Sequence, residues 1–454
     1  MKKLLLVFTT VIFTSCSFDN KTGIWKDASS ISVDDQGTKS ISNDQQEIKY
    51  EDIFTKDKFF NEEKEPDNSL AIKINDPIKI INWSEQYAIS SNNISNFFYT
   101  GNNTRISRSS RLSKLSSNKS NKIVFYKDNF ISHDHKGNIF IFSLSLNKKV
   151  FKYNFYKKNF KKYNKKINFV IDKNILYSAD NLGYLYAINL DDKSILWAKN
   201  YGIPFRSNMK FVDGQILLAN QDNVVYSINS STGKTNWTFA TSQTILKSDF
   251  ENNLALDTIN NNLFFLNTSG ELYSISYLSK KINWVLNFKN SSLGGDAELF
   301  LSHPVVTKNN NLIVATEKTI LSYDNSTAER KWKIPAESIF KPIITSKYTF
   351  VILKNDLLVC LDNENSKIIW SKNIFRNIKK NKIKNKFGSI IDFKIVNNKI
   401  NIYSTNGYLL TYNLNNGNLN SSNKISKKGI ASEVFFLDAN MLFVDTAYKL
   451  LKFN

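Results

Sequence analysis

A repeated segment constrains the fold of this 454-residue chain more than any other feature. The clearest units are ILYSADNLGYLYAINLDDKSILWAKN (175–200), ILLANQDNVVYSINSSTGKTNWTFA (216–240), LFFLNTSGELYSISYLSKKINWVLNF (263–288), LIVATEKTILSYDNSTAERKWKIP (312–335) and FVILKNDLLVCLDNENSKIIWSKNI (350–374). Each unit has short runs of β-branched and aromatic residues between turn residues, and each has a Trp, at positions 197, 237, 284, 332 and 370. The spacing of 38 to 48 residues between these Trp residues suits one four-stranded sheet per unit.

The stretch 167–200 predicts the layout of one unit. Its four strand-length segments are INFVID (167–172), ILYSAD (175–180), YLYAINL (184–190) and SILWAKN (194–200). A single antiparallel sheet of this kind cannot bury both faces, but sheets stacked around a ring can, so the repeat predicts a β-propeller. The Trp near the start of each last strand is then expected to be an apolar plug between neighbouring blades.

Two degenerate units and a partial one set the number of blades. Residues 123–155 and 390–423 keep the turns but lack the Trp, which makes seven complete units. The tail, residues 433–454, supplies three further strands, and PIKIINWSEQ (77–86) with Trp83 is the predicted fourth. We therefore expect an all-β, eight-bladed β-propeller over residues 76–454, with four-stranded antiparallel blades and a ring closed by an N-terminal strand that completes the last blade.

The N-terminus has the layout of an exported protein. Residues 1–16, MKKLLLVFTTVIFTSC, combine two lysines, an apolar run and small residues before Cys16, which is typical of a bacterial secretory signal. The residues before Cys16 resemble a lipobox, with Phe13 where Leu is usual, so Cys16 is the predicted lipidation site. An ordinary cleaved signal with a nearby Cys is the alternative. Residues 17–75 are polar and predict a flexible tether.

Neither the net positive charge nor the possible His and Cys metal ligands indicate a nucleic-acid site or a metal site. A net charge of +21 would favour nucleic acid in a cytoplasmic chain, but export argues against that partner. The basic segment 147–166 is expected to be a solvated loop, with an anionic membrane surface as the weaker alternative. The cluster SHDHKG (132–137) occupies a hairpin-turn position, where its residues are expected to form the turn. The chain has two Cys residues, Cys16 and Cys360, and few His, so we expect no metal site.

Two segments carry a family resemblance. LYAINLDDKSILW (185–197) and VYSINSSTGKTNW (225–237) resemble the pyrroloquinoline-quinone-type propeller repeat, which occurs in quinoprotein dehydrogenases and in non-enzymatic propellers. With its signal, tether and bare eight-bladed ring, the chain resembles the BamB family of the outer-membrane β-barrel assembly machinery. The resemblance implies a non-enzymatic scaffold lipoprotein without a cofactor, anchored at the periplasmic face of the outer membrane. Its implied partners are a BamA-type assembly protein and unfolded outer-membrane proteins.

The resemblance also implies contact residues. The stretch 203–237 is similar to the family's segment in which an apolar residue and an Arg lie in an interblade loop that binds BamA, so Phe205 and Arg206 are the candidate contacts. An ordinary loop charge at Arg206 is the alternative. The family also has carboxylates in the loop entering a later blade. In GGDAELFLSHPVV (294–306) only Asp296 and Glu298 are available, and the segment departs from the family pattern around them.

Two other classes of function remain open. A quinoprotein dehydrogenase would need a cation held by Glu, Asn and Asp, a catalytic Asp, a Trp stacked on the quinone and often an adjacent Cys pair. The chain has no Cys pair, its repeat accounts for the Trp residues, and it has no G-x-S-x-G, H-E-x-x-H or P-loop pattern. A propeller that binds peptide or glycan shares every feature except the loop similarity.

Overall fold

The structure is a computed structural model that describes most of the propeller and little of the N-terminus. It describes residues 60–67, 71–112, 122–156, 160, 162–244, 253–288, 299–376 and 380–454, together with strands β1 (Ser17–Phe18) and β2 (Trp25–Lys26). Residues 1–52 and 53–454 form separate units, and β1 pairs with β2 in the first. No helix in these ranges is long and apolar enough to span a membrane.

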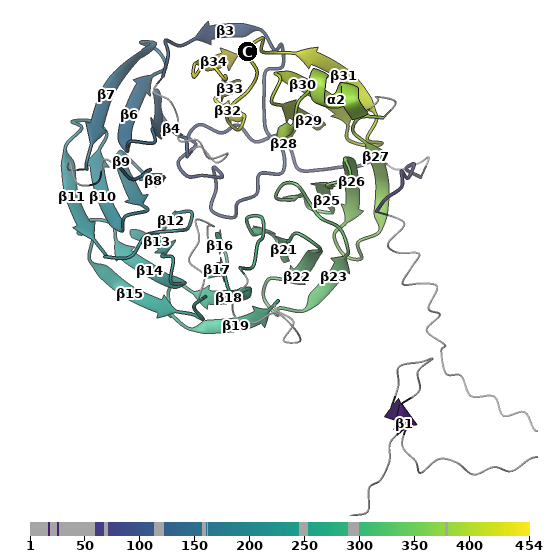
Figure 1. Ribbon diagram of the computed structural model, residues 1–454, viewed down its shortest axis with the longest axis horizontal. Coiled ribbons are helices and arrows are strands. Elements are labelled where there is room, and N and C mark those ends of the chain that lie inside the picture. The colour runs from purple at the N-terminus through teal and green to yellow at the C-terminus, as the bar shows by residue number, and fades with distance from the viewer. Residues whose placement is uncertain are drawn as a thin grey trace, which may run out of the picture. The chain divides into compact units, whose positions relative to one another are not determined.

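The second unit is a ring of eight four-stranded antiparallel sheets (Figure 1), which confirms the predicted eight-bladed β-propeller. The first four blades are β4 (Val124–Tyr126), β5 (Asn129–His133), β6 (Asn138–Ser143) and β7 (Lys148–Asn154); β8 (Ile167–Asp172), β9 (Ile175–Asp180), β10 (Tyr184–Asn189) and β11 (Ile195–Asn200); β12 (Lys210–Val212), β13 (Gln215–Ala219), β14 (Val224–Asn229) and β15 (Thr235–Ala240); and β16 (Asn253–Asp257), β17 (Asn262–Leu266), β18 (Glu271–Ser276) and β19 (Ile282–Asn287).

The remaining blades continue around the ring. They are β20 (Val306–Lys308), β21 (Asn311–Ala315), β22 (Ile320–Asp324) and β23 (Arg330–Ile334); β24 (Ile343–Ile344), β25 (Tyr348–Ile352), β26 (Leu357–Asp362) and β27 (Ile368–Asn373); β28 (Ile390–Val396), β29 (Lys399–Ser404), β30 (Tyr408–Asn413) and β31 (Leu419–Lys424); and β32 (Phe435–Leu437), β33 (Asn440–Val444) and β34 (Leu450–Phe453) with β3 (Arg105–Arg108). Helix α2 (Lys380–Lys386) lies in the connection between β27 and β28.

A repeated turn joins the second and third strands of several blades. Oδ1 of Asp180 accepts hydrogen bonds from the backbone N–H groups of Leu182 and Tyr184, at 2.8 and 2.9 Å. The same local pattern recurs at Asp134, Asn220, Asn267 and Asp445. It is an Asx turn, in which a short polar side chain satisfies the backbone donors of the hairpin. SHDHKG therefore forms the predicted turn.

The Trp residues pack between blades, as predicted. Nε1 of an outer-strand Trp donates to a backbone carbonyl of the next blade in four cases: Trp197 to Ser230, Trp284 to Asn325, Trp332 to Asn363 and Trp370 to Leu414. Gly233 has a φ of 64°, and a Cβ there would lie 2.6 Å from the Trp197 ring. Close ring packing thus explains the glycine in the Ser-Thr-Gly-Lys turn of this unit.

The strand that closes the ring differs from the predicted one. An N-terminal strand does complete the last blade, but it is β3, in which Arg105 pairs with Phe453 and Arg108 with Leu451. Arg108 also forms a 2.7 Å ion pair with the buried Asp445. The prediction that 77–86 is this strand is wrong, because the residues around Trp83 bond to several different blades instead of to β34.

The end of the predicted tether contacts one outer strand. Lys64 and Ser371 of β27 exchange two backbone hydrogen bonds of 3.0 Å each. The carboxylates of Glu63 and Glu65 form ion pairs with Arg376, and Glu65 also pairs with Lys372. Residues 61–65 thus cover an edge that antiparallel sheets otherwise leave open to other chains.

Candidate interface on the interblade-loop face

A coil crosses the centre of the ring. Residues 78–99, the axial segment, cross the ring inside the first strands of the blades (Figure 1). Backbone or side-chain hydrogen bonds join this segment to all eight blades, at Phe125, Ile171, Lys210, Leu256, Thr307, Ile344, Ile395 and Asp438. The sequence alone does not indicate the axial segment, because its apolar run and Trp83 also fit a strand.

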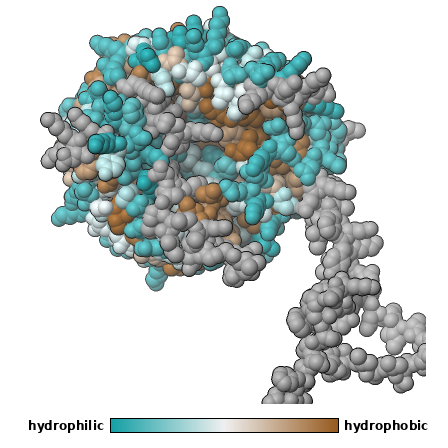
Figure 2. All heavy atoms as spheres, viewed as in Figure 1, coloured by the Kyte–Doolittle hydropathy of each residue, from teal (hydrophilic) through white to brown (hydrophobic). Residues whose placement is uncertain are grey.

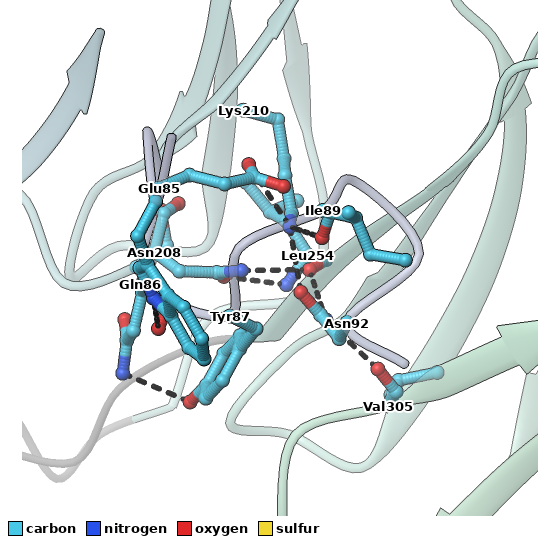
Figure 3. Close-up of polar contacts among 11 residues, drawn as sticks. Glu85, Gln86, Tyr87, Ile89, Asn92, Asn208, Lys210, Leu254 and Val305 are labelled. Carbon is cyan, nitrogen blue, oxygen red and sulfur yellow. Dashed lines mark hydrogen bonds and ion pairs between the residues drawn. The ribbon is translucent and has the colours of Figure 1, made fainter. Parts of the chain in front are cut away.

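Buried polar side chains hold the axial segment (Figure 3). Nζ of Lys210, on β12, lies 3.2 Å from the Glu85 carboxylate and donates to Oδ1 of Asn92 at 2.6 Å. Nδ2 of Asn92 donates to the carbonyls of Leu254 and Val305, each at 2.8 Å, so one amide joins three blades. Burial raises the pKa of Glu85 and lowers the pKa of Lys210, while their ion pair opposes both shifts. These buried hydrogen bonds and this ion pair therefore hold the axial segment and the blades together.

The described connections between blades lie on one face of the ring. In an antiparallel blade these connections share a face with the turns between second and third strands. We call it the interblade-loop face, and it includes residues 201–209, 299–305, 335–342, 374–376, 380–389 and 425–434. A cavity of about 1160 Å³ opens here between the axial segment and the loops around β24, β28 and β32. Figure 2 shows a hollow near the ring centre with hydrophobic residues along part of its rim.

The predicted contact loop lies on this face. Phe205 and Arg206 are in the connection between β11 and β12. The Phe205 side chain is only 3% exposed and packs edge-on against the rings of Tyr201 and Tyr226, with centroids 5.4 and 5.9 Å away. Arg206 is half-buried, and its backbone N–H donates to the carbonyl of Ala219 at 3.0 Å. The ring of Phe205 therefore holds the loop in place, and a contact with another protein at this loop stays a prediction.

The other predicted site residues lie outside the described residues. Asp296 and Glu298 fall in the gap 289–298, and Cys16 precedes the described part of the chain. Their roles also stay predictions.

Two observations bear on a quinone cofactor held through a protein-bound cation. Within the described ranges, no group of three or more His, Cys, Asp or Glu side chains is arranged to hold a metal ion. The axial segment also crosses the centre of the ring, where Trp83 is 2% exposed and Asn92 fully buried.

Comparisons with known proteins agree on the kind of propeller. The family model described as outer membrane protein assembly factor BamB matches residues 157–372. The uncharacterized protein RC0314 of Rickettsia conorii is 23% identical over 367 residues, which cover 77% of this chain and 83% of that protein. Outer membrane protein assembly factor BamB of Legionella pneumophila is 31% identical over 118 residues, 24% of this chain and 29% of that protein.

Solved structures match at the level of the fold. The crystal structure of BamB from Moraxella catarrhalis has a TM-score of 0.60 and 13% identity, and the match covers 77% of this chain and 99% of that one. A quinohemoprotein alcohol dehydrogenase from Pseudomonas putida has a TM-score of 0.57 and 8% identity, and its match covers 82% and 80% of the two chains. The eight blades, the family model and the Legionella relative together lead to one conclusion: the chain is an eight-bladed β-propeller that is similar to BamB.

Proposed function

We propose that this chain is a non-enzymatic scaffold of the outer-membrane β-barrel assembly machinery, which binds a BamA-type protein through its interblade loops. The observation that carries the proposal is the match to the BamB family model over residues 157–372, because this range contains the loop with Phe205 and Arg206. The Legionella relative, which is named as an outer membrane protein assembly factor, supports the same function.

The geometry of the loop suits a binding role. Phe205 is packed between Tyr201 and Tyr226, and its N–H donates to the carbonyl of Asp180 at 3.1 Å, so the backbone beside Arg206 is held before any partner arrives. A loop that is already ordered loses less conformational freedom on binding. Arg is also a residue type that commonly dominates the energy of protein interfaces.

The proposed location follows from the N-terminal sequence. Lipidation of Cys16 would anchor the chain at the periplasmic face of the outer membrane, with residues 17–75 as the tether. Unfolded outer-membrane proteins are the proposed further partners, and Asp296 and Glu298 remain candidate contacts in the loop before β20.

An enzyme is the less favoured alternative. The quinohemoprotein dehydrogenase resembles this chain in fold, and fold alone does not carry function. The axial segment crosses the ring centre with Trp83 and Asn92 buried, and no group of three or more His, Cys, Asp or Glu side chains in the described ranges is arranged to hold a metal ion, so both observations favour a binding protein.

An affinity purification from solubilised envelope tests the proposal. We expect the wild-type chain to recover the BamA-type assembly protein and Arg206→Glu to lose it, because the substitution reverses the charge at the proposed contact. Arg330→Glu is the matched control, since Arg330 is exposed on β23, an outer strand. Equal melting temperatures of the variants would show that folding is unaffected.

The outcomes separate the function from the contact. If the wild-type chain recovers no assembly component, the proposed function is wrong. If Arg206→Glu recovers the assembly protein as well as Arg330→Glu does, the function stands and the loop contact is wrong.

A further inference from the structure

Two charged side chains lie on the wall of the cavity beside the axial segment. They are Lys341, in the connection before β24, and Glu433, in the connection before β32. Within the described ranges, neither the Lys341 ammonium nor the Glu433 carboxylate forms a hydrogen bond or an ion pair. The Lys341 Nζ atom lies 5.7 Å from the centroid of the Tyr87 ring, which the axial segment holds against the cavity.

A neighbouring pair of charged side chains, in contrast, forms an ion pair. Lys394 and Asp392 also line the cavity, but they form a 2.7 Å ion pair, and Asp392 accepts a hydrogen bond from the backbone N–H of Val434. Burial lowers the pKa of Lys341 to about 8, and the positive charge of Lys394 contributes to the shift. Burial likewise raises the pKa of Glu433. Lys341 and Glu433 are therefore half-buried without a hydrogen-bond or ion-pair partner among the described residues, and their partial loss of hydration costs free energy that a bound ligand could offset.

The rest of the wall is largely apolar. Aromatic and aliphatic side chains from the axial segment and from three blades line it, including Trp83, Phe340, Ile343, Ile390 and Phe393. The volume of about 1160 Å³ is slightly above the usual range of small-molecule sites, about 300 to 1000 Å³. The ligand that fits has an apolar body larger than one amino acid and carries both a negative and a positive charge.

We propose that this cavity binds a short apolar peptide with free termini, whose carboxylate contacts Lys341 and whose ammonium group contacts Glu433. A fatty acid offers only the negative charge and a neutral glycan offers neither, whereas a peptide supplies both charges and apolar side chains. The site is separate from the loop at Phe205 and Arg206, so the proposal does not depend on the proposed function.

Calorimetric titration of the full chain with trileucine tests the proposal. Wild type should bind the free peptide about tenfold more tightly than either the N-acetylated or the C-amidated form, because each blocked end loses one charge-assisted contact. Lys341→Met should bind the C-amidated and free peptides equally well while still rejecting the N-acetylated form. Glu433→Gln should show the converse pattern. A destabilised variant would weaken all three forms alike, so this crossed pattern is specific to the contacts.

Lys347→Met is the matched control. Lys347 is exposed in the turn before β25, and its ammonium lies 5.8 Å from the centroid of the Tyr348 ring, so the substitution removes a similar cation–π contact outside the cavity. It should bind the three peptides as wild type does. Absence of binding to wild type, equal binding of the three forms, or binding of lysophosphatidylethanolamine in place of the peptide would each overturn the proposal.

Discussion

At the residue scale, His133 shows how one buried side chain joins two blades. Its Nε2 atom accepts a hydrogen bond from the backbone N–H of Ile167 at 3.3 Å, and its Nδ1 atom lies 3.1 Å from the carbonyl oxygen of Asp134. This arrangement requires a neutral ring with the proton on Nδ1. Burial accordingly lowers the pKa of His133 from 6.5 to about 4.

The lowered pKa predicts acid sensitivity. Between pH 6.5 and 4 the unfolded chain binds a proton at this position and the folded chain does not, so the stabilisation present above pH 6.5 is lost as the pH falls toward 4. Relative to His133→Gln, the free energy of unfolding of wild type should fall by up to about 3 kcal/mol across this range. Urea denaturation at several pH values measures the difference.

His135→Gln is the control for this prediction. His135 lies in the same turn but is only half-buried, so His135→Gln measures how much of any change comes from substituting a residue of this turn. Parallel stability curves for wild type and His133→Gln would contradict the prediction.

At the element scale, the short segment 61–65 depends on charge to stay on β27. Lys372 has a side chain only 4% exposed, and Glu65 is its carboxylate partner. Glu65→Lys should therefore leave a buried ammonium beside a second one and release the segment. We expect hydrogen exchange at the amides of Lys64 and Ser371 to accelerate by about tenfold.

A second charge reversal separates this effect from general repulsion. Glu62→Lys changes the charge of the same segment by the same amount. The Glu62 side chain takes part in no ion pair among the described residues, and its backbone carbonyl accepts a hydrogen bond from Ser371 Oγ. Its exchange rates should stay close to those of wild type. Equal acceleration in the two variants would mean that the ion pair with Lys372 does not hold the segment.

The elements also show what could be predicted from the sequence. The strands of the blade 167–200 match their predicted bounds within one residue, because each ends at a local turn with its own chemistry, as at Asp180. Ring closure depends on contacts hundreds of residues apart, and β3 is only four residues long. Trp83 fits the repeat locally, yet its ring stacks on Phe97 of the axial segment.

The candidate site was predictable only in part. Sequence similarity placed Phe205 and Arg206 in an interblade loop, and the structure agrees on the loop. The burial of Phe205 depends on Tyr201 and on Tyr226 from β14, so it follows from packing across the loop and not from the motif. The cavity at Lys341 and Glu433 joins connections more than 90 residues apart, and no local pattern indicates it.

At the scale of the whole molecule, the axial segment changes how the ring is held together. In repeat proteins each unit contacts only its neighbours, so stability is close to a sum of local terms. Here one buried coil bonds to every blade, and Asn92 alone joins the blades that begin at β12, β16 and β20. Loss of this residue should therefore weaken several blade contacts at once.

We expect Asn92→Gly to lower the free energy of unfolding of the whole ring by about 3 kcal/mol, because it leaves the buried carbonyl of Val305 without its Asn92 donor, removes one of the two side-chain donors to the carbonyl of Leu254 and takes an acceptor from Lys210. Glycine is chosen since Asn92 has a φ of 59°, where alanine would add strain. Asn103→Gly is the control: Asn103 also has a positive φ, 49°, but lies outside the axial segment, so it should cost under about 1 kcal/mol. Urea denaturation measures both, and similar losses in the two variants would mean that the axial segment does not hold the blades together.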